Sequence, residues 1–196
     1  MNKKLSSFQR EVLVGLLLGD GHLETQNGGR TYRLKVEHSE FQRDYTEWLF
    51  QLFFPLCEQK ALYRKIKNEK AYVGFRTCGS GVFRFYAQQF YKERKKVMPK
   101  IIEKLLSKTG LAIWFLDDGS KKSARHKTYN IHSLGFTKRE LMDMQEVLHG
   151  KFSVEVSLHR QKDKYYRLYV QSKSASRFRE IIEPYIRKFA SMKHKL

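Results

Sequence analysis

Two aspartates follow the two most apolar stretches of this 196-residue chain. Asp20 ends the run LLLGD, Asp118 ends the run LAIWFLDD, and a glycine follows each of them. Asp118 lies half the chain length after Asp20. Two carboxylates that meet can hold hard divalent ions, which activate water for phosphodiester hydrolysis and stabilise the leaving oxygen. The pair therefore indicates metal-dependent hydrolysis.

A lysine recurs after each aspartate at the same offset to within one position. Lys96 stands in the segment KKVMP and Lys195 in the segment MKHKL. A positioned lysine can polarise an attacking water or neutralise charge on the phosphate in the transition state. A single lysine is usually a surface charge, so the shared offset is what favours a catalytic role.

The acids and lysines predict a duplicated chain, with a first repeat at 1–98 and a second at 99–196. The first repeat is expected to contain helices at 8–19, 40–54 and 81–91 and strands at 22–25, 32–38, 61–67 and 71–77. The second is expected to contain helices at 110–117, 138–150 and 175–189 and strands near 129–134, 154–160 and 165–171. A connecting helix is expected over 99–108. The predicted fold is α+β, with two pseudo-symmetric αββαββα repeats that pack tightly.

The two apolar helices must place the acids. We expect Asp20 at the end of its helix, with Gly21 in the left-handed conformation that ends helices. An acid there meets the unfavourable end of the helix dipole, so capping does not explain it. Gly15 and Gly19 lie one turn apart and allow close backbone approach. Asp118 occupies the same position in the second repeat as Asp20 does in the first. Asp117 is therefore expected to contribute its backbone or a solvated charge.

Composition points to nucleic acid as the partner. Thirty-nine Lys and Arg against twenty Asp and Glu give a net charge of +19, and the charge is spread along the chain. No apolar run approaches the roughly 20 residues that cross a bilayer, and no signal peptide is visible. Cys57 and Cys78 match no zinc or disulfide spacing, which predicts buried thiols in a reducing compartment. No histidine stands in a metal-binding motif, so none of the seven is given a metal role.

The segments VLVGLLLGDG and GLAIWFLDDG resemble the two signature copies of LAGLIDADG homing endonucleases, and the resemblance covers essentially the whole chain. The second copy has Ile113 and Asp117 where the first has Gly15 and Gly19. The resemblance implies a monomer whose signature helices pack at the centre of a saddle of antiparallel sheets on double-stranded DNA. It also implies Mg²⁺ or Mn²⁺ held by Asp20 and Asp118 and by the carbonyls of Gly19 and Asp117, one lysine per active site, and Ca²⁺ supporting binding without cleavage.

Strand alternation predicts the DNA-reading side chains, because the face opposite the core must supply the donors and acceptors for base edges. In the first half these are Arg33, Lys35, Glu37, Tyr63, Lys65, Tyr72 and Arg76. In the second half they are Asn130, His132, Ser157, His159, Arg167, Tyr169 and Gln171. The loops 121–127 and 160–164 are expected to grip phosphates through Lys121, Lys122, Arg125, Arg160 and Lys162.

Three functions fit these features. The first is a site-specific, divalent-metal-dependent endonuclease that cuts both strands of a long asymmetric site. The second is a maturase that binds its own intron RNA, and the third is a DNA-binding regulator that does not cut. A pure binding protein gains nothing from two carboxylates that face phosphates, so the acids favour the enzyme.

Overall fold

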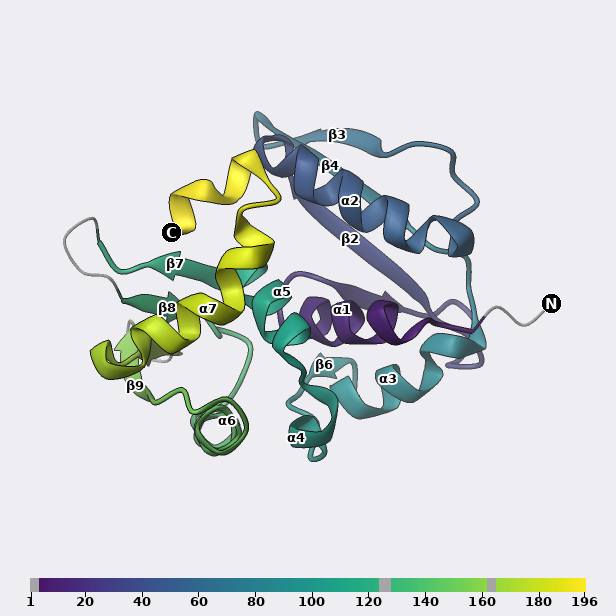
Figure 1. Ribbon diagram of the computed structural model, residues 1–196. Coiled ribbons are helices and arrows are strands. Elements are labelled where there is room, and N and C mark those ends of the chain that lie inside the picture. Colours follow the sequence, from purple (N-terminus) through teal and green to yellow (C-terminus); the bar gives the residue numbers. More distant parts are fainter. Residues whose placement is uncertain (1–3, 124–127, 162–164) are drawn as a thin grey trace.

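Two buried helices lie side by side at the centre of the computed structural model, which describes residues 4–123, 128–161 and 165–196 (Figure 1). Helix α1 spans Ser7–Leu18 and helix α5 spans Lys108–Asp118. Ser6 caps α1 in a capping box with Gln9, and the Ser107 side chain caps α5 by accepting from the N–H of Gly110. These caps fix where each helix begins, and therefore which residue stands at its far end.

The two helices approach closely at glycines. A Cβ at Gly15 would lie 2.5 Å from the carbonyl oxygen of Gly110 and 2.6 Å from the Cβ of Ile113. The expected close approach is therefore confirmed. The expectation for Gly21 was wrong, because α1 is capped by Gly19, and among the described residues the glycines with positive φ are Gly28 and Gly29. Gly21 instead packs against Leu16, and its N–H donates to the Leu16 carbonyl.

A four-stranded antiparallel sheet follows each central helix. The first has the order β1-β2-β4-β3, with strands His22–Glu24 (β1), Arg33–Ser39 (β2), Tyr63–Lys67 (β3) and Lys70–Arg76 (β4). The second has the order β7-β8-β10-β9, with strands Gly119–Lys121 (β7), Tyr129–Ile131 (β8), Val156–Gln161 (β9) and Tyr165–Val170 (β10). The same order in both sheets is the pseudo-symmetry that the repeat predicted.

Helices cover one face of each sheet (Figure 1). Helix α2 (Arg43–Phe53) packs on β2 and β4, where alternate residues such as Leu34 and Val36 are buried. Helix α6 (Lys138–Phe152) packs on β9 and β10, and helix α7 (Ala175–Ile186) packs on α5. The other face of each sheet carries the polar residues of the alternation, which gives the saddle of the predicted α+β fold.

Short elements complete the chain and correct several predicted boundaries. They are α3 (Arg84–Phe90), the two-stranded hairpin of β5 (Tyr91–Lys92) and β6 (Lys95–Lys96), α4 (Ile102–Leu105), and 3-10 turns at Glu40–Gln42, Phe54–Leu56, Gly81–Phe83, Ser172–Ser174 and Ala190–Lys195. The continuous helix predicted over 99–108 was wrong, because Ser107 is extended and caps α5. Strand β7 and the hairpin β5–β6 were not predicted, since two or three residues carry too little alternation.

Two further expectations concern the cysteines and the membrane. Cys57 and Cys78 are not joined in a disulfide and are half-buried, so they are less enclosed than predicted. Within the described ranges, the helices are all too short or too polar to cross a bilayer.

Candidate active site

The carboxyl ends of α1 and α5 lie next to each other. Asp20 follows the cap Gly19, whose N–H donates to the Gly15 carbonyl at 3.0 Å, and Asp118 is the last residue of α5. A hydrogen bond of 2.9 Å from the Asp20 N–H to Oδ2 of Asp117 joins the two ends. The packing of two apolar helices thus brings together acids that are half a chain apart.

The side chain of Asp117 is completely buried at this junction, with 0% of it exposed. Its Oδ2 accepts from the Asp20 N–H, and its Oδ1 accepts from the Tyr45 hydroxyl at 2.9 Å. Gly19 leaves the space for it, because a Cβ there would lie 2.5 Å from Asp117 Oδ2. The expectation that the Asp117 carboxylate is a solvated charge was therefore wrong.

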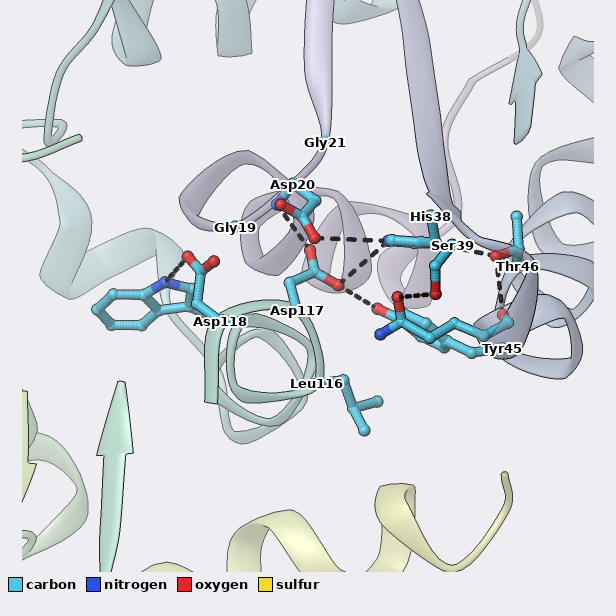
Figure 2. Close-up of polar contacts among 12 residues, drawn as sticks. Gly19, Asp20, Gly21, His38, Ser39, Tyr45, Thr46, Leu116, Asp117 and Asp118 are labelled. Atoms are coloured by element: carbon cyan, nitrogen blue, oxygen red, sulfur yellow. Dashed lines mark hydrogen bonds and ion pairs between the residues drawn. The ribbon is translucent and has the colours of Figure 1, made fainter. Parts of the chain in front are cut away.

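Asp118 points to the other side of α5 (Figure 2). Its Oδ2 accepts from the indole Nε1 of Trp114 at 3.3 Å, and it lines a cavity of about 340 Å³ with Lys96 and His132. Burial, and then the nearby charge of Asp20, raise the pKa of the Asp118 carboxyl to about 8. Burial also raises the pKa of the Asp20 carboxyl, and the nearby charge of Asp117 raises it further.

Each predicted lysine lies at the end of its own signature helix. Lys96 Nζ donates to the carbonyls of Gly19 at 2.7 Å and Gly21 at 3.0 Å. Lys195 is 6% exposed, and its Nζ contacts the last carbonyls of α5, among them those of Leu116 and Asp117. Burial lowers the pKa of both ammonium groups, while the neighbouring aspartates act in the opposite direction.

His38 and Tyr45 belong to this cluster, and sequence reasoning missed both. The Nε2 atom of His38 lies 3.7 Å from Oδ1 of Asp117 and 4.0 Å from Oδ2 of Asp20 (Figure 2). Asp20, His38 and Asp117 each offer one ligand atom, and these three atoms all lie within 4.8 Å of one another. The available signal was the alternation of β2, which places a polar His38 on the same buried face as Leu34 and Val36.

The open face of the first sheet carries the predicted polar residues. The register pairs Lys35 with Arg76 and Lys65 with Tyr72, so these side chains share one face. They also contact one another, since Glu37 accepts from the Tyr63 hydroxyl at 3.0 Å and pairs with Lys65 at 2.6 Å. The guanidinium of Arg33 pairs with Glu24 at 2.9 Å.

The open face of the second sheet is built in the same way. Arg167 stands opposite His159, and Tyr169 stands opposite Ser157 and Asn130. His132 Nε2 and Nδ1 lie 3.0 Å from the Ser120 hydroxyl and 3.3 Å from Oε1 of Gln161. Asn130, however, is 5% exposed, which does not fit a residue predicted to reach a base edge. Gln171 directly follows β10 and is half-buried.

The predicted phosphate-gripping residues are only partly described. Lys122 places its ammonium 4.8 Å from the centre of the Tyr169 ring. Lys121 lies in β7, and Arg160 lies in β9 rather than in a loop. Arg125 and Lys162 fall outside the described residues.

Comparison with known proteins gives one family. Residues 10–178 match the model of the LAGLIDADG DNA endonuclease family. The cytochrome b mRNA maturase bI2 of Debaryomyces hansenii is 30% identical, over all of this chain and 76% of that protein. The DNA endonuclease I-ChuI of Chlamydomonas applanata is 25% identical, over 93% of this chain and 92% of its own. The solved structure of the homing endonuclease I-WcaI bound to its DNA recognition sequence is similar with a TM-score of 0.88 and 26% identity, over 99% of this chain and 88% of that one.

Proposed function

Because the chain belongs to the LAGLIDADG DNA endonuclease family, we propose that it is a homing endonuclease that makes a metal-dependent double-strand break in a long asymmetric DNA site. One observation carries the proposal. Asp20 and Asp118 stand at the ends of two packed helices, and each helix end also holds a lysine of its own half on backbone carbonyls. Two sets of acid and lysine match the two phosphodiester bonds that a double-strand break must hydrolyse.

The residues at the helix ends fit a divalent cation. Burial raises the pKa of the Asp20 and Asp118 carboxyls, and the charges of neighbouring aspartates raise both further. A bound cation offsets such costs, because it favours the ionised carboxylates. Asp20 and Asp118 would hold Mg²⁺ or Mn²⁺, with the carbonyls of Gly19 and Asp117 as further ligands. When bound, the ion supplies an activated water and stabilises the leaving oxygen.

The two lysines would act on the phosphate and on the attacking water. The ammonium group of Lys96 donates two of its three protons to the carbonyls of Gly19 and Gly21. This leaves a third donor for a phosphate oxygen or a water. Both lysines are held by backbone carbonyls, so their positions follow directly from the positions of the helix ends. A fixed ammonium stabilises developing negative charge without reorganising during the reaction.

The open faces of the two sheets would contact the DNA. The molecule carries a net charge of +19, which favours a polyanion. The residues on the two faces differ, with Lys35, Tyr63 and Arg76 on one and His159, Arg167 and Tyr169 on the other. Two different halves on a single chain suit a monomer on a non-palindromic site.

A second candidate is a maturase that assists the splicing of its own intron RNA. The observation that favours it is the 30% identity to a protein named as a cytochrome b mRNA maturase. Both activities can share one basic surface. Filter binding to intron RNA in competition with duplex DNA separates them, because a maturase retains the RNA when non-specific duplex is in excess.

The proposed cleavage is tested with a randomised duplex library. The protein is incubated with the library in Mg²⁺, and the cleaved ends are sequenced, with parallel incubations in Ca²⁺ and in EDTA. We expect one long asymmetric motif to be enriched among the ends in Mg²⁺ and no cleavage in the two controls. Intact library in Mg²⁺ would overturn the proposal, and so would ends without a common motif.

A further inference from the structure

Hydrogen bonds through Thr46 determine which ring nitrogen of His38 carries the hydrogen. The Thr46 hydroxyl donates its single proton to the carbonyl of Gln42 at 2.9 Å. It can therefore only accept from Nδ1 of His38, which lies 2.9 Å away. Nδ1 carries a hydrogen as a result, and Nε2 of a neutral His38 is an unprotonated acceptor.

That Nε2 atom faces two carboxylates. Oδ1 of Asp117 lies 3.7 Å away and Oδ2 of Asp20 lies 4.0 Å away, and dashed lines mark both contacts in Figure 2. Nε2 is buried without a hydrogen-bond partner among the described residues, and the whole residue is 3% exposed. Three acceptor atoms thus converge on one point, which is unfavourable unless a cation lies among them.

The free lone pairs suit a metal ion. Oδ1 of Asp117 accepts from Tyr45 but keeps a second lone pair. Atoms bound to one ion at about 2.1 Å stand roughly 3 to 4.2 Å apart. Both distances from Nε2 fall in this range, and the separation of up to 4.8 Å among the three atoms requires the two carboxylates to move slightly closer on binding. The Asp20 side chain is 49% exposed, so solvent has access to one edge of the cluster.

We propose that Asp20, His38 and Asp117 form a divalent-metal site that is distinct from the Asp118 side of α5 and prefers Mn²⁺ to Mg²⁺. The preference follows from the ligands, because imidazole suits transition metals whereas Mg²⁺ selects oxygen ligands. Thr46 acts behind the site by orienting the imidazole. The inference rests on the proposed function only in that Asp20 is shared with the catalytic residues.

The site joins the two halves of the chain. His38 comes from β2 and Asp20 from the end of α1, while Asp117 comes from α5. Sequence spacing gives no metal motif, since the three ligands come from three separate elements. The first signature has Gly19 at the position of Asp117, so the pseudo-symmetry of the repeats does not give a second copy of this ligand set.

The test is pulsed electron paramagnetic resonance of Mn²⁺ bound to the untagged, full-length protein without DNA, together with calorimetric titration of Mn²⁺ and Mg²⁺. Nitrogen coupling to Mn²⁺ is expected in the wild type and is expected to disappear in His38→Gln. The same variant should bind Mn²⁺ at least about tenfold more weakly, and Thr46→Val about 10- to 100-fold more weakly. Circular dichroism melting confirms that each variant is folded.

Two further variants define the location. His149→Gln alters an exposed histidine on α6 and should leave the nitrogen coupling intact. Asp118→Asn should also leave it intact, whereas Asp117→Asn should weaken Mn²⁺ binding. The proposal is overturned if the wild type shows no nitrogen coupling or if the coupling survives His38→Gln. Cleavage of target DNA in Mg²⁺ is measured separately, so that failure of the metal site and failure of the proposed endonuclease function are distinguished.

Discussion

At the scale of single residues, the burial of Asp118 links charge to stability. Its carboxyl has a pKa of about 8 in the folded protein against an ordinary value of 3.8. Between these values the folded state binds more protons than the unfolded state, so the free energy of unfolding falls as pH rises. When no metal is bound, the stability that this carboxyl contributes is therefore lost progressively as pH rises from 3.8, and the loss is complete above about pH 8.

Asp118→Asn should stabilise the metal-free protein at pH 8 and much less at pH 5. Each unit of the pKa shift corresponds to about 1.4 kcal/mol, and each kcal/mol raises the melting temperature by about 2–4 °C at this size. Thermal melts in EDTA at both pH values measure the effect. Asp143→Asn, at a half-exposed position on α6, is the control and should show no such gain. Equal melting of wild type and Asp118→Asn at pH 8 would contradict the pKa.

Residues near the acids also show where sequence reasoning ends. Asp20, Lys96 and Lys195 were found because a repeat makes their spacing visible, and the structure places each lysine at its own helix end. Asp117 was misjudged because its burial depends on the missing Cβ of Gly19 across the helix interface. A one-dimensional pattern does not reveal a space that a distant residue leaves open.

At the scale of elements, the close crossing of α1 and α5 positions the chemistry. Gly15→Ala should destabilise the protein by about 1–3 kcal/mol, because its Cβ would overlap the Gly110 carbonyl and Ile113. The matched control is Gly150→Ala on α6, where an added Cβ meets nothing within 4 Å. That change should be neutral or stabilise by up to about 1 kcal/mol. Urea unfolding measures both, and similar effects at the two sites would contradict the packing.

Each lysine belongs to one helix end, so each should serve one strand of the DNA. Lys96→Met or Lys195→Met should slow one strand by about 10²- to 10³-fold, the loss expected for one electrostatic stabiliser. Nicked plasmid should then accumulate during a time course on supercoiled DNA that carries the site. Lys95→Met and Lys193→Met change exposed neighbours and should cut at the wild-type rate. Equal slowing of both strands would show that the lysines are not divided between the sites.

The main elements were predictable because long apolar or alternating segments have a clear period. Helix α1 and strands β1 and β2 appear within one or two residues of their expected bounds. Strand β7 and the hairpin β5–β6 are too short to show a period, so tertiary pairing alone defines them. Lys96 lies on that hairpin, so its repeat offset was visible in the sequence but the element that supports it was not.

At the scale of the whole molecule, charge should dominate binding to DNA. A net charge of +19 on 196 residues suits a footprint on the order of ten phosphates. Each neutralised phosphate contributes a slope of about −0.9 to log K against log salt. Fluorescence anisotropy on the target duplex in Ca²⁺ between low and moderate salt gives this slope. A value shallower than about −3 would be inconsistent with a duplex-length footprint.

The central claim is that Asp20 and Asp118 are both needed to cut the two strands, and its most direct test compares cutting with binding. Asp20→Asn and Asp118→Asn change charge with little change of volume, so both should bind the target duplex in Ca²⁺ about as tightly as the wild type. In Mg²⁺, neither should linearise a supercoiled plasmid that carries the site. Wild-type cutting by both variants would contradict the active site, and the two acids would then have to be part of a DNA-binding architecture.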